Sequence, residues 1–109
     1  MPPAVRNLFI PPHAVEPGRE HLESLVEHPH FRLEVIHSNT ATSPPDFWYD
    51  QDRPEWVTLL RGEASLRFDQ GEPVALAPGD SLIIEAHQRH RVESTSSDAV
   101  WLAVFFDPA

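Results

Sequence analysis

The chain of 109 residues contains no cysteine. Disulfide bonds, thiolate metal sites and cysteine nucleophiles are therefore excluded, and cysteine usage gives no information about the redox compartment. Any bound metal would need histidine, carboxylate, amide or water ligands. The chain also lacks a phosphate-binding loop, a dinucleotide glycine signature and an exposed-serine elbow. Nucleotide-driven and serine-hydrolase chemistry are therefore not expected.

Positive charge is scarce. Lysine and arginine together number 8, against 17 aspartates and glutamates, and the formal net charge is -9. Such a surface repels a phosphate backbone, so no nucleic acid partner is expected. No apolar run reaches the roughly 20 residues that a membrane span needs, and the Met-Pro-Pro start lacks the basic and apolar regions of a secretory signal. We therefore expect a soluble, cytoplasmic protein with no membrane partner.

Glycine is also rare, with 4 residues, whereas proline occurs 12 times. Each proline removes a backbone donor and confines strands to the segments between prolines, so long helices are not expected from Pro2 to Pro17. A chain of this length makes one compact domain that buries roughly two thirds of its unfolded surface. We predict an extended N-terminal arm over residues 1–19 and a single domain over residues 20–109.

Alternation of apolar and polar residues predicts strands over most of the remaining chain. The segment 31–35 alternates cleanly and is rich in strand formers. Residues 20–26 also fit helical spacing, but the run is too short for a lone helix, so a strand is favoured. Turn signals at 69–71 and 78–80 separate further short segments. At least seven short antiparallel strands predict an all-β barrel or sandwich.

Two polar side chains fall in line with expected core residues. Glu55 shares a strand face with Val57 and Leu59, and His90 shares one with Val92. An ionised group on an apolar face is costly unless it is paired, hydrogen-bonded or bound to a metal. We expect Glu55 and His90 to face each other in a pocket, where the carboxylate would favour protonated His90 if no metal is bound. The alternative is a metal-free pair between Glu55 and a histidine or an arginine.

Three adjacent aromatic residues at 47–49 precede this strand, and two polar residues follow them. Alternation puts Trp48 and Asp50 on one face, and Tyr49 and Gln51 on the other. Only one of these two sets can line a pocket, and the pattern leaves both open.

Two spacings match a known family. In Glu55 to Gly62, a glutamate is followed by six residues and a glycine, as in the first cupin motif. Gly79 is followed by five residues, a three-residue turn, two residues and His90, as in the second motif. Across residues 31–106 the chain resembles the small single-domain cupins of the cupin 2 conserved-barrel family, and in particular an uncharacterised bacterial subgroup. The resemblance implies a jelly-roll β-barrel, a homodimer, and Glu55 and His90 as metal ligands.

The sequence departs from the family pattern beside the first motif and in the turn of the second. Metal-binding cupins carry a His-x-His pair before the glutamate; here those positions hold Tyr49 and Gln51 or, in the other allowed register, Trp48 and Asp50. His87 replaces the usual turn glycine, and it is a further candidate ligand because it lies across a tight turn from the motif histidine. A site of His87, His90, Glu55 and an amide or carboxylate from Gln51 or Asp50 suits Zn²⁺, Ni²⁺, Mn²⁺ or Fe²⁺.

Three functions from different classes fit these observations. We favour a barrel that binds a small molecule, and with it a divalent metal, in its pocket. The alternatives are a metal-dependent enzyme of the dioxygenase or isomerase type and a structural, dimerising barrel with a vestigial pocket. The predicted site has Glu55, His87 and His90 as metal ligands and Trp48, Tyr49 and Gln51 as contacts for the bound molecule.

Overall fold

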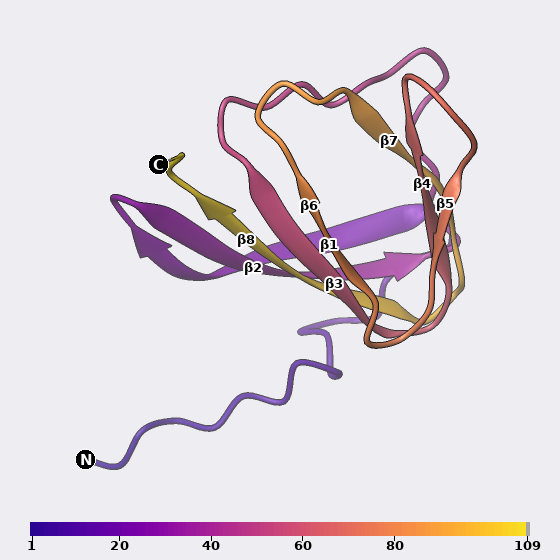
Figure 1. Ribbon diagram of the computed structural model, residues 1–109. Helices are drawn as coiled ribbons and strands as arrows, with labels where there is room; N and C mark the ends of the chain where they lie inside the picture. Colours follow the sequence, from indigo (N-terminus) through magenta and orange to yellow (C-terminus); the bar gives the residue numbers. More distant parts are fainter. Residues whose placement is uncertain (109) are drawn as a thin grey trace.

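The computed structural model describes residues 1–108, which form two antiparallel β-sheets that face each other as a barrel (Figure 1). These residues contain no helix, and so none long and apolar enough to cross a membrane. The predicted all-β jelly-roll barrel is confirmed. Its strands are β1 (Arg19–His28), β2 (Phe31–Asn39), β3 (Glu55–Arg61), β4 (Ala64–Phe68), β5 (Val74–Leu76), β6 (Ser81–Ile84), β7 (His90–Thr95) and β8 (Ala99–Phe106).

The larger sheet has the strand order β1-β2-β8-β3-β6, and the smaller sheet has the order β5-β4-β7. The most apolar strand, β8, lies at the centre of the larger sheet, where β2 and β3 pair with its two edges. β8 is paired along both edges and turns Ala99, Trp101 and Ala103 into the core, which suits an almost wholly apolar sequence. The segment 20–26, for which helical spacing competed with a strand, belongs to β1.

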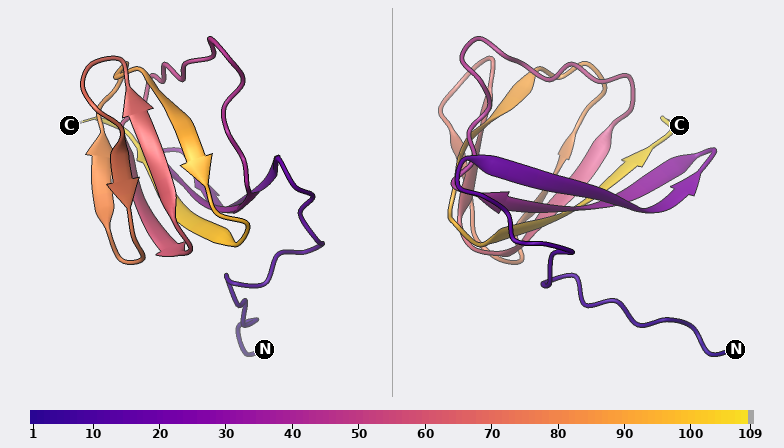
Figure 2. Two further views of the ribbon diagram at one scale, coloured as in Figure 1. Left: turned by 90° about the vertical axis from the view of Figure 1, so that its right-hand side faces the viewer. Right: turned by 180° about the vertical axis from the view of Figure 1, so that it is seen from behind.

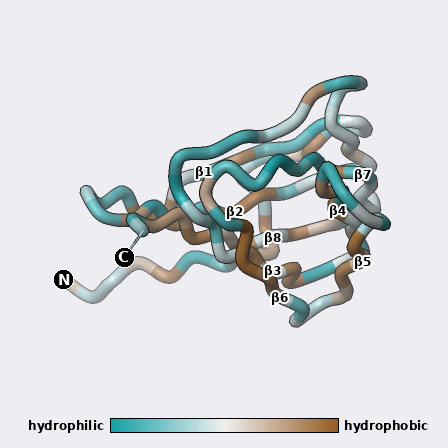
Figure 3. Tube along the Cα trace, turned by 45° about the horizontal axis from the view of Figure 1, so that its top comes forward, coloured by the Kyte–Doolittle hydropathy of each residue, from teal (hydrophilic) through white to brown (hydrophobic). Residues whose placement is uncertain are grey.

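The hydrophobic core lies between the two sheets. Leu59, Ile84 and Ala103 are completely or almost completely buried there, because alternate residues of each strand point inward. Figure 3 shows the apolar stretches along the strands and the hydrophilic stretches along connecting loops. The core therefore fills the barrel between the sheets and leaves polar groups to its rim.

The N-terminal segment runs away from the two sheets and is tied to their outer side (Figure 2). Arg6 forms a two-pronged ion pair with Glu23, at 2.6 and 2.9 Å. Buried His37 donates from Nε2 to the carbonyl oxygen of Leu8 over 2.8 Å. These contacts cover the outer face of β2 around Val35 and His37, so Val35 is fully buried although it points away from the barrel interior.

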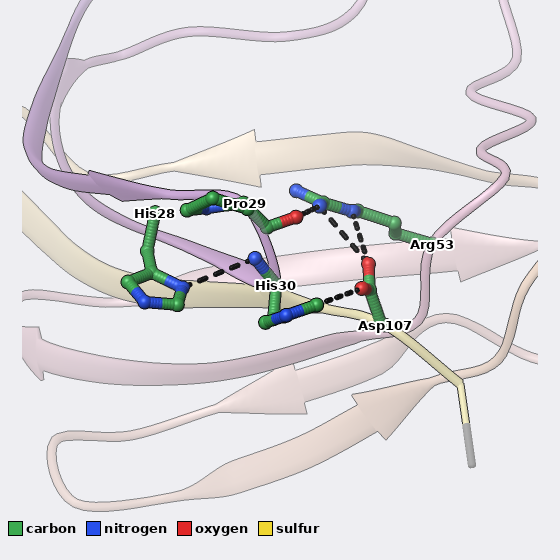
Figure 4. A network of polar contacts seen from close by, with 5 residues as sticks. All are labelled: His28, Pro29, His30, Arg53 and Asp107. Atoms are coloured by element: carbon green, nitrogen blue, oxygen red, sulfur yellow. Dashed lines mark hydrogen bonds and ion pairs between the residues drawn. The ribbon is translucent and has the colours of Figure 1, made fainter.

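A polar network joins the turn between β1 and β2 to the C-terminal end of β8 (Figure 4). Asp107 accepts from Arg53 Nε at 3.1 Å and lies 2.9 Å from His30 Nδ1. Arg53 also donates to the carbonyl oxygen of Pro29 over 2.8 Å. The network holds the loop before β3, and with it the start of that strand, against the β1–β2 turn.

Candidate functional site

A cavity of about 90 Å³ opens between the two sheets. Strands of both sheets and the loop before β3 contribute to its wall, and most of the wall is apolar. The polar side chains that line the cavity are Glu20, Glu34, Tyr49, Gln51, Glu55 and His90.

Glu55 begins β3 and points into the cavity from the same face as Val57 and Leu59, as alternation predicted. It is 7% exposed, and Gln51 Nε2 donates to its Oε1 over 3.3 Å. Burial raises the pKa of the Glu55 carboxyl to about 7; the Gln51 hydrogen bond opposes this rise, and the nearby Glu34 charge adds to it. Near neutral pH, Glu55 can therefore hold or release a proton.

His90 begins β7 and reaches the cavity from the opposite sheet. It is 5% exposed, and its Nδ1 donates to the carbonyl oxygen of Gln88 over 2.9 Å. This bond leaves Nε2 as an acceptor, and no group in residues 1–108 hydrogen-bonds it. Burial lowers the pKa of His90, so the expectation that Glu55 would favour its protonated form is wrong. The hydrogen bond to Gln88 opposes this fall, and Glu55 is not among the groups that shift the pKa of His90.

The loop before β3 is held against β7 by backbone pairing. Tyr49 and His90 exchange two backbone hydrogen bonds, at 2.7 and 3.1 Å, and their rings stack with centroids 5.3 Å apart. Burial, followed by Glu20, Glu55 and Glu34, raises the pKa of the Tyr49 phenol. The pairing register turns Tyr49 and Gln51 into the cavity. The cavity wall is thus formed by one of the two sets that alternation left open.

Trp48, in contrast, does not line the cavity. The guanidinium carbons of Arg89 and Arg91 lie 5.4 and 5.8 Å from the centroid of its ring, close enough for cation–π attraction. Trp48 therefore packs with the basic side chains of β7 and the turn before it, and contact with a cavity ligand stays a sequence prediction for this residue.

His87 also lies outside the cavity wall. Its side chain is 64% exposed, and Nδ1 lies 2.7 Å from Oδ1 of Asp50, which raises the pKa of His87. Its backbone N–H donates to the carbonyl oxygen of Gln51 over 2.7 Å. The φ angle of +62° explains why glycine is usual at this turn position. The structure thus separates His87 from Glu55 and His90. The contacts of His87 with Asp50 and Gln51 hold the loop that carries these two residues.

Three donors in the cavity, from His90, Glu55 and Gln51, are of the kinds that bind a divalent transition metal. Metal-binding histidines commonly donate one ring N–H to a backbone carbonyl and bind through the other nitrogen, which is the arrangement of His90. Glu55 supplies a carboxylate and Gln51 an amide oxygen. No three His, Cys, Asp or Glu side chains within residues 1–108 are placed to hold a metal together, so the amide would have to complete the set.

Sequence reasoning missed two carboxylates of the wall, Glu20 on β1 and Glu34 on β2. Glu34 is 8% exposed, and Glu20 accepts from Ser38 Oγ over 2.8 Å. A signal existed, because Glu34 shares its strand face with Ile36. Alternation alone could not reveal it, since the apolar residues Leu33 and Val35 lie on the opposite face, which β2 turns away from the barrel interior.

Comparisons with known proteins agree with this architecture. A cupin-domain family profile matches residues 32–105. A protein from Ralstonia eutropha JMP134, provisionally named a mannose-6-phosphate isomerase, is 39% identical over 97% of this chain and 100% of its own, with a TM-score of 0.86. No protein with a curated description matches.

More distant solved structures share the fold. A conserved Streptococcus pyogenes protein of unknown function is 19% identical over 97% of this chain and 89% of its own, with a TM-score of 0.76. KdgF from Halomonas sp. is 18% identical over 89% of this chain and 87% of its own, with a TM-score of 0.69. The profile match covers most of the barrel, including both motifs that carry Glu55 and His90. The chain therefore belongs to the cupin family, as a small single-domain member.

Proposed function

We propose that the protein binds a small molecule in the barrel cavity, with Glu55 and His90 as its principal contacts. One observation carries the proposal: Tyr49, Gln51, Glu55 and His90, the four positions that the cupin motifs give to metal ligands, all line one cavity. The two that keep the motif residue are more than nine-tenths buried. Buried polar groups without a full set of partners are costly, so their retention in an apolar wall favours a binding role.

A divalent transition ion, Zn²⁺, Ni²⁺, Mn²⁺ or Fe²⁺, is proposed as part of this site. Glu55 and His90 would hold it, with the Gln51 amide oxygen as a third donor. When bound, such an ion supplies Lewis acidity that polarises a ligand oxygen or lowers the pKa of bound water. The chain itself fixes the His90 ring through Gln88 and keeps bulk water away from Glu55.

Protein purified without a histidine tag is expected to contain about one transition metal ion per chain, and His90→Ala is expected to lose it. Elemental analysis measures both. His87→Ala is the matched control, because that imidazole is exposed and bonds Asp50 instead of lining the cavity. An absence of metal after reconstitution with each of the four ions would contradict the metal proposal, and loss of metal in His87→Ala would bring His87 back as a ligand.

A metal-dependent isomerase is the second candidate. It is favoured by the name of the Ralstonia eutropha relative, which is 39% identical over nearly the whole chain. In that case Glu55 and His90 would hold the ion, which would polarise an oxygen of the substrate. Turnover of mannose 6-phosphate by the metal-loaded protein would support this candidate, and inertness toward it would count against it.

A second copy of this chain is proposed as a partner, on the outer face of the larger sheet (Figure 1). One apolar residue from each of the five strands forms a row there, in direct register. Its ends are open, with Val26 43% and Ile83 54% exposed. The row consists of Val26, Leu33, Val104, Trp56 and Ile83.

The charge of the chain favours a second copy over other partners that could bind this apolar row. The outward residues of β8 and β6 carry no charge, whereas each chain carries a net charge of -9. Two such chains repel each other over most of their surface and can approach closely only where carboxylates are absent. An isologous sheet-on-sheet contact across this row meets that condition.

Ile83→Glu is expected to convert a dimer into a monomer, because it places a charge within the apolar row of both copies. Light scattering after size exclusion gives the mass directly. Val74→Glu is the control, since Val74 is an exposed apolar residue of the smaller sheet, 37% exposed. A monomeric wild-type protein would contradict the proposal, as would an Ile83→Glu variant that stays dimeric.

A cytoplasmic location stays a prediction from the sequence.

A further inference from the structure

We propose that the molecule bound in the barrel cavity is a small organic cation, a primary amine, and not a phosphate or a carboxylate. The inference rests on the proposed binding function and specifies the class of ligand. It follows from the charges, the hydrogen-bonding atoms and the size of the cavity.

Three carboxyl groups from three different strands line the cavity: Glu20 on β1, Glu34 on β2 and Glu55 on β3. No lysine or arginine belongs to the wall within residues 1–108. The cation nearest to Glu34 is Arg32, whose Nε lies 3.4 Å from the carboxylate and whose guanidinium carbon stacks 4.4 Å from the Phe105 ring centroid. One arginine outside the wall does not balance three carboxyl groups at pH 8, above the pKa of about 7 that burial gives Glu55, so an anionic ligand would be repelled.

The polar atoms that remain free in the wall are mostly acceptors. One N–H of the Gln51 amide donates to Glu55, and Trp101 Nε1 donates to Ser38 over 3.1 Å, so the donors that remain are the second N–H of Gln51 and the Tyr49 hydroxyl. His90 Nε2 is an acceptor with no partner in residues 1–108, because Nδ1 carries the proton. Glu34 likewise accepts no hydrogen bond from the described part of the chain, apart from its 3.4 Å ion pair. A bound group that donates therefore satisfies His90 Nε2 and the Glu34 carboxylate, the two buried acceptors that lack a hydrogen bond.

An ammonium group meets both requirements at once. It carries one positive charge and three donors, enough to reach two carboxylates and one imidazole nitrogen. Hydrogen bonds between charged partners in a site of low dielectric are among the strongest that proteins form. A hydroxyl group offers one donor and no charge, and a phosphate offers acceptors and negative charge to a wall that already has both.

The rest of the ligand must be small and apolar. The cavity holds about 90 Å³, compared with the roughly 150 Å³ of an apolar cavity known to take up benzene, so only a ligand smaller than benzene fits. The apolar part of its wall includes Leu66, Ile84, Val92 and Phe105. A short alkylamine matches this volume and this wall, whereas a hexose phosphate exceeds the volume and carries the wrong charge.

Isothermal titration calorimetry with three probes of one size and different charge tests the inference. Butylamine, 1-butanol and butyrate are titrated at pH 8 into chelator-treated protein. Butylamine is expected to bind at least about tenfold more tightly than 1-butanol, and butyrate is expected not to bind. Glu34→Gln is expected to weaken butylamine binding about tenfold and to leave 1-butanol unaffected. Glu27→Gln, an exposed carboxylate outside the wall, is the control and is expected to change neither.

Binding of 1-butanol or butyrate as tightly as butylamine would overturn the cation assignment and leave the binding function standing. Failure of all three probes, while Zn²⁺ still binds in a His90-dependent manner, would also overturn the amine and leave the cavity as a metal site. Failure of the three probes and of Zn²⁺ together would overturn both proposals. Equal losses in Glu34→Gln and Glu27→Gln would show a general charge effect and contradict a role for the Glu34 carboxylate in the cavity.

Discussion

Replacing Glu55 by glutamine is expected to stabilise the metal-free and ligand-free protein by about 3 kcal/mol at pH 8 and to change it little at pH 4. Burial raises the pKa of Glu55 from 4.5 to about 7. Below pH 4.5 the carboxyl is protonated in both the folded and the unfolded protein, so it favours neither. As the pH rises toward 7, only the unfolded chain releases the proton freely, and the free energy of unfolding falls. Glutamine keeps the shape and the hydrogen bonding but cannot ionise.

The measurement is chemical denaturation of wild type and Glu55→Gln at several pH values between 4 and 8. Glu72→Gln is the control, because it removes one negative charge from an exposed position. The wild-type curve is expected to decline through the window from 4.5 to 7 relative to that of Glu55→Gln, and Glu72→Gln is expected to follow the wild type. Parallel curves for wild type and Glu55→Gln would contradict a buried, proton-holding carboxyl.

Gly62→Ala is expected to destabilise the protein by about 3 kcal/mol, from backbone strain and overpacking together. Gly62 follows β3 with a φ angle of +85°, a region that alanine adopts only with strain. An added Cβ would also collide with the side chains of Ser96 and Asp98 and with the backbone of Ala99. This glycine ends the first cupin motif, and the close approach of the segment before β8 gives a physical reason for the residue.

Gly71→Ala separates the two contributions. Gly71 has a φ angle of +93°, similar to that of Gly62, but nothing lies within 4 Å of an added Cβ. It is expected to cost about 1 kcal/mol, which is the strain alone. Thermal denaturation of the two variants gives the difference between their losses of stability, which is the cost of the steric collision at Gly62. Equal losses in both variants would contradict a steric role for the segment from 96 to 99.

The barrel and two of its cavity residues could be predicted from the sequence because local rules determine them. Alternation puts Glu55 on the face of Leu59, and the motif spacing gives His90 an inward position at the start of its strand. Both predictions need only period-two geometry and short turns. The strands were predicted for the same reason, including β1, where the helical alternative would have left a lone short helix.

Other features of the site depend on contacts between segments far apart in the chain. Tyr49 rather than Trp48 lines the cavity because the loop pairs with β7 at His90, about 40 residues further along the chain, and alternation within the loop cannot choose that register. Glu34 is buried because β2 turns this side chain into the barrel, whereas the apolar residues Leu33 and Val35 lie on its outer face. The pKa of His90 falls because burial outweighs the hydrogen bond to Gln88, which is a balance of magnitudes and not a pattern.

The stability and binding predictions have one origin. Three carboxyl groups in a mostly apolar wall are costly in the empty protein, and Glu55 reduces the cost by keeping its proton near neutral pH. A cation bound among them would remove that cost. The empty protein is therefore expected to be less stable than its complexes, and a ligand of the cavity will stabilise the protein by an amount that grows with the logarithm of its concentration over its Kd.

The most direct test of the central claim, that Glu55 and His90 bind the ligand, is a high-resolution electron density map of this cavity. Crystals of untagged protein are soaked separately in Zn²⁺ and in butylamine. The predicted result is density other than water that contacts both a Glu55 carboxylate oxygen and His90 Nε2 in at least one soak. A cavity filled only by water in both soaks, with Glu55 bonded to Gln51 alone, would contradict the claim.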